Sequence, residues 1–183
     1  AKIIEAVIDL IAEVGAEAVQ MRDVAGRSGV ALATVYRYFS SKDHLLAAAL
    51  EDWQKRLTRR IMASGRPPAQ DPSSGMVDYL HRALRAFHRN PQITALMHQM
   101  MTSTVPEAKV AIDEMNRTNM AMFNRLLDGV APEQVPNVSF GINAALASAL
   151  TAMLVDALTL EEATTRVEWV ARVLIDCHAV PSH

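Results

Sequence analysis

Tyr36, Arg37 and Tyr38 are the side chains of this sequence best suited to bind a polar partner. Val35 and Phe39 lie four residues apart, so in a helix both are expected to face the core, which leaves the other three outside. Phenol hydroxyls and guanidinium groups are donors that phosphates and base edges accept. We therefore expect contact with nucleic acid, and bidentate contact with guanine makes Arg37 the best candidate for sequence recognition.

Two short helices joined by a tight turn are expected to position these side chains. Residues 21 to 28 have apolar positions at helical spacing, and Gly29 supplies the left-handed residue that ends a helix. A second helix at residues 33 to 39 follows after the short turn of a helix-turn-helix. Lys42 comes next, where Ser40 and Asp43 have capping-box spacing, and its charge and the nearby backbone amides suit a phosphate.

The same residues resemble the DNA-binding domain of the TetR family of bacterial transcription repressors. The pattern of that family stands here as Thr34-Val35-Tyr36, Phe39 and Ser41-Lys42, preceded by the residues MRDVA at 21 to 25. This resemblance covers roughly the first 60 residues. Within the family, EAVQMRDVA, YRYF, SSKDHLL and the triplet Arg89-Asn90-Pro91 are similar to actinobacterial repressors of sterol-catabolism genes.

The resemblance implies which residues touch DNA. Phosphate contacts are expected from Arg22, Tyr36 and Lys42, and base-edge or nearby phosphate contacts from Leu32, Ala33, Thr34, Arg37 and Tyr38. This chain has Ala33 where the family often has glycine or proline, and Ala31 where it often has a serine cap. The alternative is that the two tyrosines only pack the three-helix unit.

Composition agrees with a helical protein. Half of the 183 residues are hydrophobic but only 5% are aromatic, which favours helices over sheets. The net charge is −2, with +1 on residues 1 to 63 and −3 on the rest, so charge alone does not decide for DNA binding. We predict an all-α fold of about nine helices, with a helix-turn-helix DNA-binding domain at 1–45 and a ligand-binding and dimerisation domain at 46–183. The predicted helices are 2–14, 21–28, 33–39, 42–63, 76–89, 91–101, 107–128, 133–158 and 160–178, and residues 64–75 form a loop.

The last two predicted helices carry a stripe of small and apolar residues that suits self-association. In the family these helices form a four-helix dimer interface, which here would contain Gly141, Ala144, Ala145, Ser148, Ala149, Ala152, Val167, Val170 and Leu174. The alternative is that they close the core of the monomer. The apolar run from 140 to 160 contains Asn143 and Asp156, so we expect a buried helix and no membrane span. Thr159 and Glu162 have capping-box spacing, and Cys177 is predicted to be a small core residue.

The second domain has more apolar residues than a simple bundle needs. Methionines fill core, but they also recur where a site accepts a bulky apolar guest. The resemblance favours a pocket for a small hydrophobic effector, sterol-derived or acyl, oriented by two asparagines. The candidate lining consists of Trp53, Leu57, Leu80, Leu84, Phe87, Met97, Met100, Met101, Met115, Asn119, Met122, Phe123 and Asn143.

The sequence therefore predicts a cytoplasmic, homodimeric repressor that a ligand releases from palindromic double-stranded DNA. We expect neither enzyme activity nor a cofactor, because the six histidines lack the spacing of zinc or di-iron motifs, and glycine-rich phosphate loops are missing. A protein-binding helical adaptor is the alternative, and a helical-bundle enzyme is a weaker one.

Overall fold

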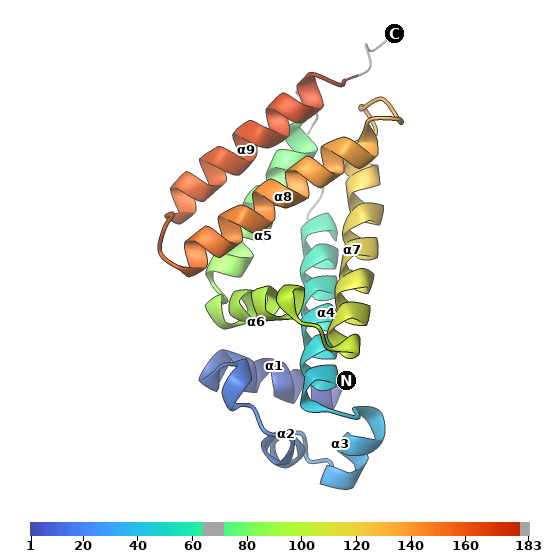
Figure 1. Ribbon diagram of the computed structural model, residues 1–183, viewed down its shortest axis with the longest axis vertical. Coiled ribbons are helices and arrows are strands. Elements are labelled where there is room, and N and C mark those ends of the chain that lie inside the picture. The colour runs from blue at the N-terminus through green and yellow to red at the C-terminus, as the bar shows by residue number, and fades with distance from the viewer. Residues whose placement is uncertain (64–71, 180–183) are drawn as a thin grey trace. The chain divides into compact units, whose positions relative to one another are not determined.

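The computed structural model describes residues 1–63 and 72–179 of the chain. In this part it consists of nine α-helices and one short 3-10 helix (Figure 1), so the all-α prediction is confirmed. The elements are α1 (Lys2–Val14), η1 (Ala16–Ala18), α2 (Met21–Ser28), α3 (Leu32–Tyr38), α4 (Lys42–Ala63), α5 (Ser74–His88), α6 (Pro91–Thr102), α7 (Pro106–Leu126), α8 (Val135–Leu154) and α9 (Leu160–Asp176).

The chain forms two compact units. The first contains residues 1–56 and 90–116, and the second contains the described part of residues 57–89 and 117–183. The first unit thus joins α6 and the start of α7 to the N-terminal helices. Compactness does not test which residues bind DNA or effector, so the functional division between 45 and 46 stays a prediction.

The helix bounds agree with the predicted ones to within two residues, except at the end of α8. The predicted loop at 64–75 is wrong at its end, because Ser74 and Gly75 already belong to α5, while residues 64–71 lie outside the described part. Helix α8 ends at Leu154 and not at 158. Asp156 adopts a left-handed φ of 55°, and the N–H groups of the next two residues both donate to the Ala152 carbonyl. This turn ends the helix without the glycine that usually marks such an end.

The N-terminal helices form the expected three-helix head. Val7, Val24 and Val35 are fully buried where α1, α2 and α3 meet. Gly29 has φ 67° and ends α2 as predicted, and the Val30 N–H donates to the Ala25 carbonyl at 3.2 Å. This left-handed turn directs the chain from α2 into α3.

In the second unit, α8 and α9 lie side by side and both pack on α5 (Figure 1). Thr159 begins α9 with the predicted capping box, because the Glu162 N–H donates to Thr159 Oγ1 at 3.2 Å and Glu162 accepts the Thr159 N–H at 2.9 Å. The prediction for Cys177 is wrong: α9 ends at Asp176, and the cysteine after it is exposed. Among the described helices only α8 is long and apolar enough to cross a membrane, a test that core helices of soluble proteins also pass.

A polar network ties α9 to α5. Glu168 Oε1 accepts a hydrogen bond from Arg172 Nε at 2.9 Å, and Glu168 Oε2 lies 2.8 Å from His81 Nε2. Arg172 also donates to the hydroxyl of Ser73, which is buried just before α5. The hydrogen bond from Arg172, with a smaller contribution from His81, holds the pKa of Glu168 below its ordinary value, although burial opposes the shift.

This lowered pKa predicts an acid-sensitive contribution to stability. A carboxyl group with a lower pKa in the folded state stabilises the protein above its unfolded pKa, and that stabilisation is lost as the pH falls through the folded value. Replacing Glu168→Gln should lower the free energy of unfolding by about 1 kcal/mol at pH 7, with the difference shrinking below about pH 4.5.

Denaturant titrations of both proteins between pH 7 and pH 3 would measure this difference. Glu161→Gln is the matched control, because Glu161 is exposed on the same helix. A difference between Glu168→Gln and wild type that does not change with pH would contradict the assignment.

Candidate nucleic-acid interface

Helix α3 presents nearly all of its side chains to solvent. Val35 is the buried residue of this seven-residue helix. Tyr36 is 51% exposed and Tyr38 is 60% exposed, and Arg37 is also exposed. Neither tyrosine ring is therefore buried in the three-helix head, which argues against the alternative that they serve only as packing.

The remaining predicted contacts of α3 are also accessible. Leu32 and Ala33 are exposed and Thr34 is half-buried. Ala31 precedes the helix without a side-chain cap, as its residue type implies. The helix therefore offers its first-turn N–H groups without a serine or threonine oxygen on them.

Arg37 lies against the ring of its neighbour. Its guanidinium carbon is 5.2 Å from the centroid of the Tyr38 ring. A cation–π contact at an exposed site contributes only about 0.5–1 kcal/mol. A phosphate or guanine can therefore draw Arg37 away from the ring at small cost.

The start of α4 differs from the predicted capping box. Ser41 is the cap, because its hydroxyl accepts the His44 N–H at 3.0 Å. Ser40 instead contacts the His44 ring at 3.3 Å. The predicted box between Ser40 and Asp43 is therefore wrong by one residue, although α4 begins at Lys42 as predicted.

Lys42 is part of the head as well as a predicted phosphate contact. Its ammonium group donates to the carbonyl of Glu17 in η1. An ammonium group has three N–H donors, so this bond leaves donors for a phosphate. Arg22, at the start of α2, has an exposed side chain whose Nε lies 3.6 Å from Asp23 Oδ1. Such a surface pair is weak and competes little with a phosphate.

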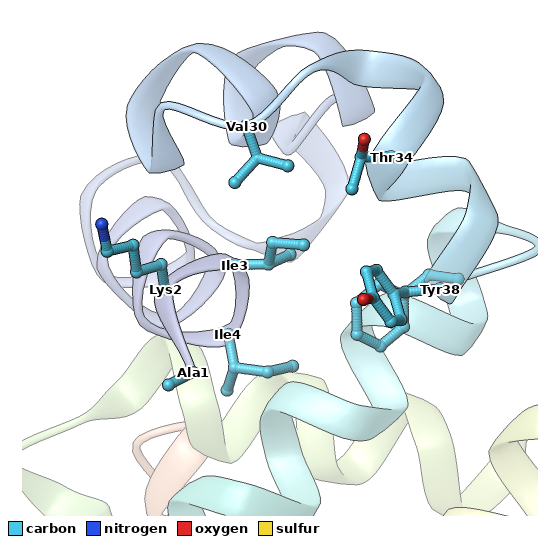
Figure 2. Close-up of a pocket in the computed structure, with 8 residues that line it drawn as sticks. Ala1, Lys2, Ile3, Ile4, Val30, Thr34 and Tyr38 are labelled. Atoms are coloured by element: carbon cyan, nitrogen blue, oxygen red, sulfur yellow. The ribbon is translucent and has the colours of Figure 1, made fainter.

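A hollow of about 420 Å³ lies beside α3 in the head (Figure 2). Across it, Thr34 and Tyr38 of α3 face Ile3 and Ile4 at the start of α1, and Val30 closes one side. This hollow was not predicted from the sequence, in which the adjacent isoleucines at 3 and 4 are its only signal. Two predicted DNA contacts thus border an apolar wall.

The predicted effector residues of the second unit are mostly buried. Asn119 and Asn143 are half-buried, while the others form its apolar interior: Leu57, Leu80, Leu84, Phe87, Met122 and Phe123. Tyr79, which the sequence analysis missed, is buried among them with its ring edge-on to Phe123 at a centroid distance of 6.1 Å. The feature of the sequence that could have indicated this burial is that Tyr79 is next to Leu80 on the apolar side of α5.

The predicted effector residues of the first unit are less uniform. Met97, Met100 and Met115 are buried and Trp53 is half-buried. Met101 is 52% exposed, so its assignment to an interior is wrong. It lies near the end of α6, where its side of the helix faces solvent.

Most residues of the predicted dimer stripe are at least partly accessible in the single chain. Ala149 and Val167 are buried, Ala144 and Ser148 are exposed, and the half-buried members are Gly141, Ala145, Ala152, Val170 and Leu174. A Cβ on Gly141 would come within 2.6 Å of Leu174 Cδ1, so the absence of a side chain there lets α8 approach α9. The large apolar residues left exposed on these helices are Phe140, Trp169 and Val173, and Val155 directly after α8 is exposed as well.

Comparison with known proteins agrees with this geometry. Residues 3–49 match the family described as bacterial regulatory proteins, tetR family. The chain is 35% identical over 134 residues to the HTH-type transcriptional repressor KstR of Rhodococcus jostii, an alignment that spans 73% of this chain and 61% of that relative. It is 33% identical over 184 residues to the repressor of the same name from Mycolicibacterium smegmatis, spanning 98% of this chain and 88% of that relative. The chain belongs to the TetR family.

The TetR fold is also seen in solved structures. The transcriptional regulator FadR from Bacillus subtilis, in complex with stearoyl-CoA, matches with a TM-score of 0.74 and 17% identity, covering 95% of this chain and 96% of that one. TetR proteins are DNA-binding transcription regulators and not enzymes, so the enzyme alternative is excluded. In the described residues, no group of three or more His, Cys, Asp or Glu side chains could hold a metal ion.

The exposure of Tyr36 leads to a testable prediction. Tyr36→Phe removes one hydroxyl from the surface of the TetR head and should weaken binding to a selected DNA duplex by about threefold to tenfold, the effect of one lost hydrogen bond. Fluorescence anisotropy with labelled duplex would measure the change. The melting temperature should stay the same, because the ring is exposed. Unchanged DNA affinity would remove Tyr36 from the interface.

Proposed function

We propose that this TetR protein is a cytoplasmic, homodimeric repressor that binds a palindromic duplex and is released by a small hydrophobic effector. The observation that carries the proposal is the outward face of α3, where Tyr36, Arg37 and Tyr38 lie together on a helix anchored by Val35. Residues 1–45 act as the DNA-binding domain. The predicted contacts are Arg22 and Lys42 at the helix starts, together with the exposed residues of α3.

Arg37 is proposed to read sequence, and exchanging its cationic group tests this. Arg37→Lys keeps the charge but loses the planar fork that binds guanine through two hydrogen bonds. We expect this variant to retain most nonspecific affinity and to lose about 1–3 kcal/mol of discrimination at one base pair. Selection from a random duplex pool, followed by binding curves at several salt concentrations, would measure both quantities.

Arg37→Ala is the comparison for that experiment. It should lose the same discrimination and should weaken nonspecific binding more than Arg37→Lys does, because it also removes the positive charge. If Arg37→Lys selected the same sequences as wild type, Arg37 would be only a phosphate contact. If wild type preferred no duplex at all, the repressor proposal would fail and the adaptor alternative would gain support.

The homodimer is proposed to form through the exposed apolar face of α8 and α9. Phe140 is 77% exposed and Trp169 is 65% exposed, and large aromatic residues of this kind are typical anchors of protein interfaces. Two DNA-binding heads must lie about 34–36 Å apart to enter successive major grooves on one side of a duplex. A second copy of the chain supplies the second head.

Charged substitutions on this face should separate the copies. Trp169→Glu and Phe140→Glu are expected to convert the dimer to a monomer in analytical ultracentrifugation, and to weaken binding to a two-half-site duplex by more than about tenfold. Val110→Glu is the matched control, since Val110 is an exposed apolar residue on α7 of the first unit. A dimer that survives both α8 and α9 substitutions would place the interface elsewhere.

The effector is proposed to be a large hydrophobic molecule, sterol-derived or acyl. Support comes from the buried apolar residues of the second unit, such as Leu80, Leu84 and Phe123, and from the stearoyl-CoA named in the FadR complex. An effector that binds one conformation of the repressor more tightly than another shifts the population, and DNA must then weaken effector binding by the same factor.

A further inference from the structure

Tyr79 is a buried polar group that the repressor proposal has not used. It is only 6% exposed, and its ring packs edge-on against Phe123 of α7. Burial raises the pKa of Tyr79 to about 12. The phenol therefore stays protonated at neutral pH, where it can donate one hydrogen bond and accept another.

Thr58 places a second hydroxyl beside this phenol. It lies close enough to lower the pKa of Tyr79, against the larger effect of burial. The Thr58 oxygen is itself buried, yet it makes no hydrogen bond of ordinary geometry. Buried hydroxyls without partners are rare in native proteins, because losing water without a replacement costs free energy. A group that hydrogen-bonds here would remove this cost.

A second hydroxyl without a partner lies in the same unit. Ser139 of α8 is fully buried, and its oxygen has no hydrogen-bond partner among the described residues. Helix α8 packs on α5, the helix that carries Tyr79. The described interior of the second unit is therefore mostly apolar, and its buried side-chain atoms without a hydrogen-bond partner are hydroxyl oxygens.

We propose that Tyr79 and Thr58 form the polar end of the effector site and bind an uncharged oxygen, a hydroxyl or a carbonyl, on an otherwise apolar molecule. This inference rests on the proposed function and specifies the chemistry of the effector. Two neutral hydroxyls can both donate to and accept from such an oxygen. An ionised carboxylate or sulfate would lose its hydration here and would gain only neutral donors in return. The half-buried Asn119 and Asn143 are less protected from water and therefore orient the guest less strongly.

Three sterols with one skeleton can test this chemistry. Cholesterol carries a neutral hydroxyl, cholesterol sulfate carries an ionised group at the same position, and cholestane has no oxygen. The wild-type protein should bind cholesterol, delivered from cyclodextrin, at least about fivefold more tightly than either of the others. Quenching of tryptophan fluorescence or calorimetry would measure the affinities.

Conservative variants then assign the preference to named atoms. Tyr79→Phe and Thr58→Val each remove a hydroxyl with little change of shape, and should abolish the preference for cholesterol over cholestane. Thr58→Ser keeps the hydroxyl and should keep the preference. Thr102→Val is the matched control, because Thr102 is exposed at the end of α6 and bonds only to carbonyls of its own helix.

The outcomes separate this inference from the repressor proposal. A wild-type protein that binds cholesterol no more tightly than cholestane or cholesterol sulfate would overturn the inference, and so would equal preferences in wild type and Tyr79→Phe. Binding of the selected duplex in the absence of sterol should be the same in all variants. If wild type bound no duplex selectively even without sterol, the repressor proposal would be overturned instead. Thermal unfolding of each variant shows whether a lost preference reflects a lost fold.

Discussion

The proposed DNA interface depends on the head stabilising α3, a helix that is too short to be stable by itself. Helix α3 has seven residues and buries one of them, and isolated helices of this length do not persist in water. The head supplies what α3 lacks: the left-handed Gly29 sets its direction, and Val35 fixes its inner side. After the helix, the ring of Phe39 packs edge-on against His44 at 5.4 Å. Because the anchoring lies on one side, the other side is free for polar contacts.

Local signals made this head predictable. A glycine at a left-handed position and the four-residue spacing of Val35 and Phe39 act within one helical turn, so sequence alone locates α2, the turn and α3 to within a residue. The choice between Ser40 and Ser41 as the cap of α4 was not predictable in this way. Both serines are favourable N-cap residues, and the spacing of Ser40 to Asp43 pointed to the one that is not the cap.

Long-range packing decided the parts that sequence reasoning missed. Small residues in α8 suggested a surface for another copy, and the sequence did not show that one of them, Gly141, also accommodates Leu174 of the same chain. The exposed aromatic residues Phe140 and Trp169 were overlooked, because a helical pattern shows that a side is apolar and not what covers it. Tyr79 was missed altogether. Its hydroxyl matters only beside Thr58, which is 21 residues earlier in the sequence.

Helix α5 places the proposed guest contact and the bond to α9 on different sides of one rigid element. Successive helical residues are rotated by about 100°, so Tyr79 and His81 point in nearly opposite directions. Tyr79 faces the interior, whereas His81 meets Glu168 of α9 at 2.8 Å. Trp169, the exposed aromatic residue next to Glu168, lies on the proposed dimer face. If the two proposals hold, a guest that favours one position of α5 acts, through the Glu168 contact, on a helix of the proposed dimer face.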